Sequence, residues 1–149
     1  MKDLQKTRIE IGSFIMVSLG IYTSVISILW IFLTEIMFIS DFGWYTGMTY
    51  ADYLNSAPRF AEMYIITKKL IGIFLLAMGL LTIIISKNSY SKSEKWSWYA
   101  LLIAGCTPWM TFIIYKIVIG YIGYSMVTFV IGASLSVIGL AIPAKEILS

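Results

Sequence analysis

Five ionisable residues stand near the ends of long apolar segments, where their charges could pair, bind ions or carry protons. They are Glu35, Glu62, Lys68, Lys69 and Lys116. Charged side chains inside a membrane are costly, so those that occur there are paired or functional. At about 1.5 Å per helical residue, Lys69 and Lys68 lie about 27–29 Å from Lys87, near the far edge of a ~30 Å hydrocarbon core. We expect one polar cluster at the outer membrane boundary.

This polar cluster has two interpretations. In the first, its members are helix-end lysines that reach the interface and form modest ion pairs. In the second, Glu35 is a proton- or cation-coupled site. Because Lys68 and Lys69 project about 100° apart around a helix, only one of them can comfortably face Glu35.

Membrane helices are the elements expected to position these groups. Of the 149 residues, 59% are hydrophobic and 13% are charged, against roughly 45–50% and about 25% in soluble domains. Residues 70–86 carry no charge on any side of a helix, which excludes the surface helix of a soluble bundle. The sequence predicts an all-α, up-down-up-down bundle, a single domain over residues 1–149, with transmembrane helices at about 9–39, 58–86, 92–115 and 122–142.

An aromatic outer loop is expected at residues 40–57, between the first and second helices. Its aromatic residues are Phe42, Trp44, Tyr45, Tyr50 and Tyr53. Trp and Tyr favour the membrane–water boundary because their rings are amphipathic. We expect this loop to cover the polar cluster, and to act as a lid if Glu35 is a coupled site.

The distribution of lysine and arginine predicts the orientation. Seven of these residues lie on one expected side of the membrane: Lys2, Lys6, Arg8, Lys87, Lys92, Lys95 and Lys145. Four lie on the other side or at its edge: Arg59, Lys68, Lys69 and Lys116. Since cytoplasmic loops carry the excess of positive charge, both termini are expected in the cytoplasm, with the chain in the cell membrane.

Small residues in the fourth expected helix form a stripe for close packing. Gly132, Ser136 and Gly139 are four and three residues apart, which places them on one helix face. Small residues let membrane helices approach closely. The stripe could contact another subunit or a second copy, or it could pack within this chain, and the sequence leaves both alternatives open.

Pro108 is expected to kink the third helix. Proline has no backbone N–H, so it leaves the carbonyl one turn earlier, near Ala104, without its helical donor. Membrane helices tolerate such residues when neighbouring groups satisfy the backbone. We expect a structural bend at this position.

Several kinds of chemistry are excluded by composition. The chain has no histidine and one cysteine, Cys106, which removes intramolecular disulfides, bis-histidine haem ligation, Cys/His zinc sites and histidine acid catalysis. An enzyme would have to use Asp41, Asp52, Glu35 and the lysines, so we expect no enzyme and no cofactor. The short basic segments do not form a face that could follow nucleic acid.

Three short motifs carry a family resemblance. They are Lys68-Lys69-Leu70-x-Gly72, Lys95-Trp96-x-Trp98-Tyr99-Ala100 and Gly139-Leu140-x-x-Pro143. With them the chain resembles uncharacterised prokaryotic four-helix membrane proteins, some grouped as DoxX-like. The resemblance implies a fold and no particular activity.

Two functions are consistent with these features. The first is a noncatalytic accessory subunit or assembly component whose small-residue stripe and aromatic loop contact a larger membrane complex or a second copy. The alternative is a small transporter or a lipid- or solute-binding membrane protein with a polar site near Glu35. In both, the lipid bilayer is the surrounding partner.

Overall fold

The computed structural model describes residues 2–120, 122–123 and 125–149, and over these residues it contains helices and no strands. The prediction of an all-α fold is confirmed. The α-helices are α1 (Lys2–Phe32), α2 (Thr34–Thr46), α3 (Tyr50–Ser56), α4 (Pro58–Asn88), α5 (Lys95–Leu101), α6 (Thr107–Val118), α7 (Ser125–Ala141) and α8 (Ala144–Leu148). A 3₁₀ turn covers Tyr90–Lys92, and a π-helical segment covers Leu102–Cys106.

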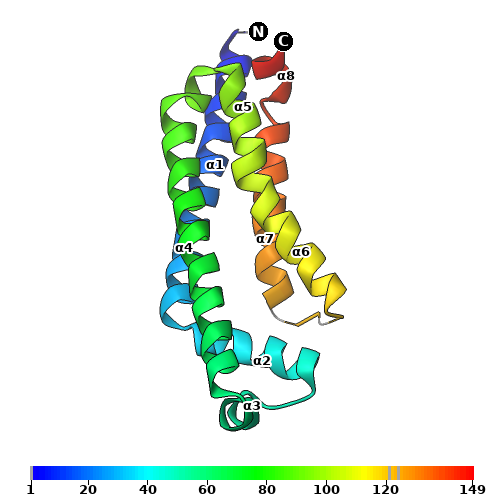
Figure 1. Cartoon of the computed structure of the whole chain (residues 1–149). Helices are drawn as coiled ribbons and strands as arrows, with labels where there is room; N and C mark the ends of the chain where they lie inside the picture. Colours follow the sequence, from blue (N-terminus) through cyan, green and yellow to red (C-terminus); the bar gives the residue numbers. More distant parts are fainter. Residues whose placement is uncertain (1, 121, 124) are drawn as a thin grey trace.

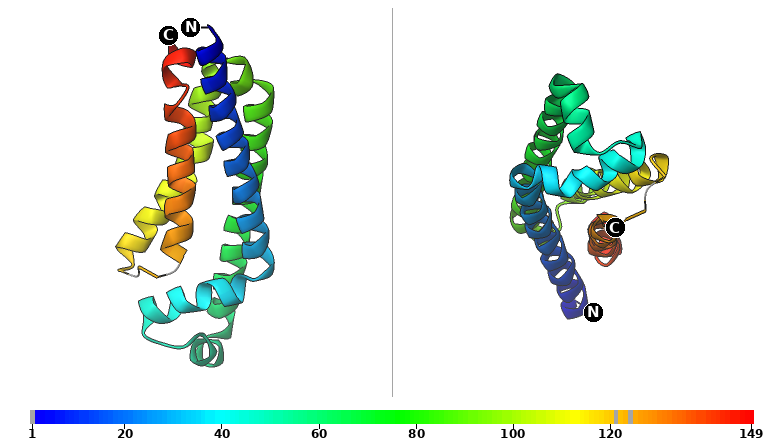
Figure 2. Two further views of the ribbon diagram at one scale, coloured as in Figure 1. Left: turned by 180° about the vertical axis from the view of Figure 1, so that it is seen from behind. Right: turned by 90° about the horizontal axis from the view of Figure 1, so that it is seen from below.

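Three stretches of helix are long and apolar enough to cross a membrane. They are Leu4–Phe32, Pro58–Lys92 and Lys95–Val118, and α7 is a shorter apolar helix of 17 residues. The long helices run side by side, with both termini at one end (Figures 1 and 2). We call this the terminal end, and the opposite end, which carries α2 and α3, the α2–α3 end.

The first predicted helix, at 9–39, is wrong at its far end, because α1 ends at Phe32 and the chain bends at Leu33. The Thr34 hydroxyl donates to the Trp30 carbonyl, one turn earlier. Such a hydroxyl competes with the backbone for a helical carbonyl and often bends the helix. From this bend α2 runs across the end of the molecule, toward α6 and α7 (Figures 1 and 2).

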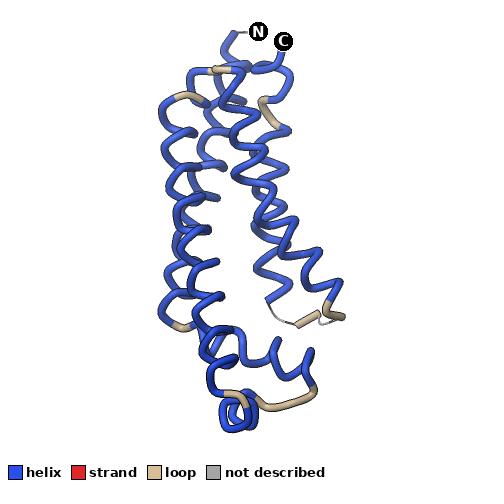
Figure 3. Tube along the Cα trace, viewed as in Figure 1, coloured by secondary structure: helices blue, strands red, loops and turns tan. Residues whose placement is uncertain are grey.

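The predicted loop at 40–57 is also wrong, since most of it is helical, as the coloured tube makes clear (Figure 3). Gly47 ends α2 with φ 71°, a left-handed conformation that glycine adopts without strain. Thr49 then caps α3 by accepting a hydrogen bond from the Asp52 backbone N–H at 3.1 Å. The polar and aromatic composition suggested a loop, but these residues form two short helices with their own caps.

The third predicted helix, at 92–115, begins three residues later than expected. Ser93 has φ 62°, which is incompatible with an α-helix, so α5 starts at Lys95. The π-helical segment lies directly before Pro108, and the ribbon changes direction there as it passes into α6 (Figure 1). A wider turn at this place fits the missing proline N–H. Helix α6 ends at Val118, past the expected boundary.

The fourth predicted helix, at 122–142, corresponds to α7 over Ser125–Ala141. Tyr121 and Tyr124, beside its expected start, lie outside the described residues. Past Ala141 the chain turns at Pro143 into α8, whose Ile147 is 1% exposed. The terminal helix therefore packs against the rest of the molecule.

The predicted small-residue stripe is buried within this chain. Ser136 donates to the carbonyls of Gly105 and Gly132 at 2.9 and 2.8 Å. A Cβ atom at Gly132 would collide with the Trp109 indole, and one at Gly139 would lie 2.6 Å from the Met16 sulfur. Helix α7 thus uses this face to approach α1, the π-helical segment and α6 closely.

Candidate functional site

The centre of the candidate site is an ion pair between α2 and α6. The Lys116 ammonium lies 2.5 Å from a carboxylate oxygen of Asp41, and the two side chains are 0% and 4% exposed. The bend at Leu33 is what brings Asp41 beneath α6. Because each buried charge loses its hydration, each depends on the other for compensation.

Lys68 of α4 forms the second cationic part of the site. Its ammonium donates a hydrogen bond to the Tyr115 hydroxyl at 3.3 Å. It also lies 4.7 Å from the ring centroid of Tyr115 and 5.3 Å from that of Tyr64. A cation over aromatic faces is attracted by the ring quadrupoles. Lys68 is therefore held between α4 and α6 by aromatic residues from both helices.

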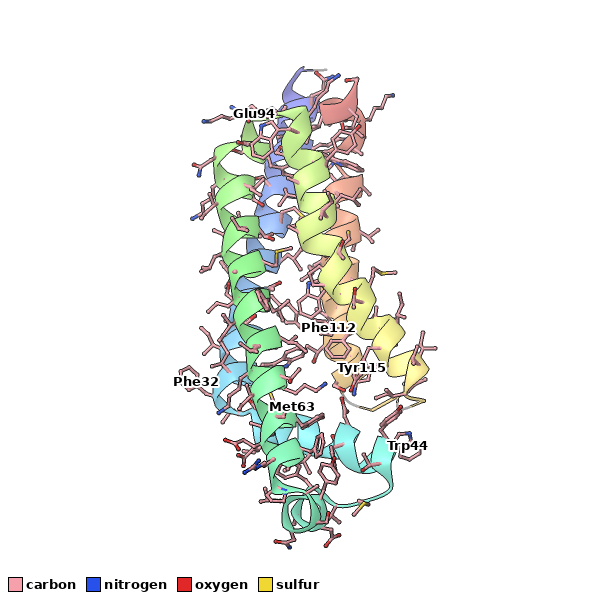
Figure 4. All side chains as sticks on the ribbon, viewed as in Figure 1. Phe32, Trp44, Met63, Glu94, Phe112 and Tyr115 are labelled. Atoms are coloured by element: carbon pink, nitrogen blue, oxygen red, sulfur yellow. The ribbon has the colours of Figure 1, made fainter. Side chains whose placement is uncertain are left out.

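A cavity of about 170 Å³ lies at this place and is lined by both charged and aromatic side chains. Asp41 and Lys68 line its polar part. The apolar lining comes from Trp30, Ile71, Phe112, Tyr115 and Phe129, with Thr111 beside them. Phe112 and Tyr115 lie on the side of α6 that faces α4 (Figure 4).

The size of this cavity limits what it can hold. An apolar cavity of about 150 Å³ in a protein can take up a benzene-sized molecule. The Trp30 and Phe112 rings stand edge to face, with centroids 4.8 Å apart, so the wall is well packed. The site can accept a small group that has both an apolar surface and a polar end.

The predicted cluster of five ionisable residues is divided between two faces of α4. Lys68 lines the cavity and Lys116 pairs with Asp41. Glu35, Glu62 and Lys69 instead line a separate groove of about 520 Å³, together with Arg59. Adjacent lysines on a helix project in different directions, and Lys69 is the one on the side of Glu35.

The Glu35 groove is an open, mixed-charge surface. Glu35, Arg59, Glu62 and Lys69 are all exposed. Burial raises the pKa of the Tyr50 phenol above its ordinary value, and the nearby Glu35 carboxylate acts in the same direction. Tyr50 therefore stays neutral at physiological pH. Exposed charges of both signs are expected to pair weakly and to exchange with water.

The predicted aromatic residues divide into a packed group and an exposed pair. Phe42 is 6% exposed and contacts the rings of Tyr50, Tyr53 and Tyr64 at centroid distances of 5.7, 5.0 and 5.2 Å. Trp44 and Tyr45 are 61% and 70% exposed, and Trp44 projects near the end of α2 (Figure 4). Because Phe42 follows Asp41 directly, the packed group helps to hold the carboxylate in place.

Of the residues that line the cavity, only Lys68 was among the predicted site residues. The seven others are Trp30, Asp41, Ile71, Thr111, Phe112, Tyr115 and Phe129. The expected third helix ended at residue 115 and placed Lys116 at the membrane edge, so no counter-ion was sought. In the structure Lys116 lies inside α6, where its charge needs one. Asp41 was considered only as a residue that an enzyme would have to use, and its pairing with Lys116 was not expected because its segment was interpreted as a loop. Trp30 and Tyr115 had no distinguishing signal among the many aromatic residues of the helices.

No metal centre or relative helps to interpret the site. Among residues 2–120, 122–123 and 125–149, no group of three or more His, Cys, Asp or Glu side chains could hold a metal ion. The chain matches no protein-family model, no curated protein and no solved structure. The resemblance to DoxX-like proteins therefore stays a prediction, and the site is interpreted from its own chemistry.

Proposed function

We propose that this chain is a noncatalytic membrane protein that binds a small amphiphilic molecule from the bilayer in the cavity between α4 and α6. The observation that supports this most is that Asp41 and Lys68 line the same cavity as a group of aromatic side chains. An amphiphile offers both kinds of surface, since its polar group can meet the charges while its apolar part meets the rings. This proposal takes up the alternative of a lipid- or solute-binding protein and moves its site from Glu35 to Lys68.

The proposed membrane arrangement has four spans with both termini in the cytoplasm. Helix α7 supports the fourth span, because its 17 residues extend about 25 Å, close to the thickness of the hydrocarbon core. The excess of basic residues lies in the segments at the terminal end, including Lys87, Lys92 and Lys95. In this arrangement the α2–α3 end, with the cavity near it, faces the outer leaflet of the cell membrane.

An accessory subunit was expected to use two contact surfaces, the small-residue stripe and the aromatic segment. Gly132, Ser136 and Gly139 of the stripe are buried within this chain, whereas Trp44 and Tyr45 of the aromatic segment are exposed. A catalytic function has little support, because Asp41 is paired with Lys116 and Glu35 and Asp52 are exposed. Ligand binding is the function that uses the buried charges.

Ligand retention tests the proposal. The protein is purified from its native membrane in a mild detergent through a C-terminal tag and examined by intact-complex mass spectrometry. We expect a stoichiometric amphiphile bound to the wild type. Thr111→Phe, which fills the cavity, removes the ligand. Ile114→Phe, on an exposed position of α6 outside the cavity lining, leaves it bound.

Two results would overturn the proposal. One is a wild-type protein that carries no ligand, or a ligand that is retained equally by Thr111→Phe and Ile114→Phe. The other is recovery as a stoichiometric part of a larger complex with nothing in the cavity, which would establish the accessory-subunit function instead.

A further inference from the structure

A second cavity lies next to the first, between α4 and α6, and we call the two cavities together the seam. The second cavity also measures about 170 Å³ and is lined by Ile71, Phe74, Leu75, Met78, Pro108 and Phe112. Ile71 and Phe112 belong to both cavities, so the two share a wall. Among the described residues, none of those that line the second cavity is charged. The seam therefore changes from charged to wholly apolar along its length.

The positions of the lining residues along α4 show which end of the seam is charged and which is apolar. Lys68 and Met78 are ten residues apart, which corresponds to about 15 Å along the helix. Lys68 lies toward the α2–α3 end of α4, and Met78 lies on the other side of the helix midpoint, toward the terminal end. Phe74, between them, is 71% exposed, so the seam is accessible from the side where lipid would lie. A lipid of the outer leaflet would have the same order, with its head at the boundary and its chain inward.

The net positive charge of the site favours a ligand with a negatively charged head group. Asp41 pairs with Lys116 at 2.5 Å and also interacts electrostatically with Lys68, so these three described residues together carry one net positive charge beside the cavity. Lys68 already contacts the hydroxyl of Tyr115. A phenolic hydroxyl can donate as well as accept, so Lys68 and Tyr115 can both donate to one acidic group. Hydrogen bonds between charged partners are about twice as strong as neutral ones.

We infer that the ligand is a single-chain lipid acid, with its carboxylate beside Lys68 and Tyr115 and its hydrocarbon chain in the seam from Ile71 to Met78. This inference rests on the proposed function and specifies its ligand class. The two small cavities in series provide width for one chain and a compact head.

A comparison of lipids that differ in charge tests the inference. Palmitate, hexadecanol and hexadecyl phosphate are titrated into the wild type in nanodiscs of neutral phosphatidylcholine, with empty nanodiscs as background. We expect palmitate to bind at least about tenfold more tightly than hexadecanol, the range of a charged hydrogen bond. Hexadecyl phosphate binding more tightly than palmitate would replace the carboxylate with a phosphate head and overturn the inference.

Two adjacent lysines supply the matched variants. Lys68→Gln should abolish the preference for palmitate over hexadecanol, and Lys68→Arg should keep it. Lys69→Gln, on the other face of α4, should leave the preference unchanged. Thermal unfolding of each variant verifies that it is folded. Equal binding of the acid and the alcohol by the wild type, or equal loss in Lys69→Gln, would contradict the inference.

A further variant tests the position of the chain. Met78→Trp fills the apolar end of the seam and should weaken palmitate binding at least about tenfold while leaving octanoate, whose chain is shorter, unaffected. Equal loss for both acids would place the chain elsewhere. These results are distinct from failure of the proposed function, in which neither palmitate nor hexadecanol binds above the nanodisc background.

Discussion

Lys116 and Asp41 are 75 residues apart in the sequence, yet the ammonium and the carboxylate lie 2.5 Å apart and are almost fully buried. The pair ties the transverse helix α2 to α6. Among the described residues, the other two ion pairs each include a partner that is more than half exposed. The Asp41–Lys116 pair is thus the electrostatic contact on which the α2–α3 end depends most.

Removing one partner of this pair should be strongly destabilising. Asp41→Asn leaves the Lys116 ammonium buried without a counter-charge, which costs about 3–5 kcal/mol. We expect a marked fall in the thermal unfolding temperature of the detergent-solubilised protein. Asp52→Asn removes a carboxylate from an exposed position at the same end and should have little effect.

A double variant separates the charge effect from packing. Replacing both partners with apolar residues, in Asp41→Leu with Lys116→Met, removes the desolvation cost and the attraction together. Its stability should return close to that of the wild type. If Asp41→Asn unfolds at the same temperature as Asp52→Asn, the buried pair is not present in the folded protein.

Local signals predicted the start of α4 but not the bend before α2. The expected second helix began at Pro58, where α4 begins, because proline suits the first turn of a helix and is visible in the sequence. The bend at Leu33 has no glycine or proline. It depends on the hydroxyl of Thr34 and on the contacts that α2 makes with α6, which are tertiary and therefore invisible to a local pattern.

The candidate site was predicted in part for the same reason. The lysines were included in the predicted polar cluster because charged residues stand out within or beside an apolar segment. Their division between two faces depends on which side of α4 each neighbouring helix covers. Asp41 joined the site only once α2 turned across the end of the molecule, so a pattern that treated it as part of a loop could not pair it with Lys116.

Close packing of α7 on α6 predicts opposite effects for two glycine substitutions. Gly132→Ala places a methyl group against the Trp109 indole and should destabilise the protein by about 1–3 kcal/mol. Gly43→Ala in α2 meets only an ordinary contact at 3.5 Å and should be neutral or stabilising by about 0.5–1 kcal/mol. Thermal unfolding measures both. Equal stability of the two variants would contradict the observed packing of α7.

The turn before α5 predicts a loss of stability in acid. Hydrogen bonding from Ser89, then from the Trp96 indole at 2.6 Å, lowers the pKa of Glu94 below its ordinary value of 4.5. Since the folded-state pKa is lowered, this stabilisation is present above pH 4.5 and is lost as the pH falls through the folded-state value. Thermal unfolding over an acidic pH series should show the loss, and Glu94→Gln should reduce it. An identical acid response in Glu94→Gln would assign it to other carboxylates.

The two termini are joined by an ion pair whose loss should expose the C-terminus to protease. Arg8 donates to Glu146 at 2.9 Å, and the Glu146 side chain is 8% exposed. Arg8→Gln should loosen α8 and raise the rate of tryptic cleavage after Lys145 about three- to tenfold. Glu10→Gln, which removes the exposed pair with Lys6, is the control and should cleave like the wild type. Equal rates in all three proteins would show that the pair does not hold α8.

Photo-crosslinking in the native membrane tests the central claim most directly. A palmitate analogue with a photoactivatable group on its chain is supplied to cells, irradiated, and its adducts are mapped by peptide mass spectrometry. Binding in the seam predicts adducts concentrated between Lys68 and Met78 of α4 and between Pro108 and Tyr115 of α6, reduced by excess palmitate and by Lys68→Gln. Adducts spread evenly over the exposed apolar faces of α1, α4 and α7, and unaffected by either treatment, would show that the lipid only surrounds the protein and that the cavity holds no ligand.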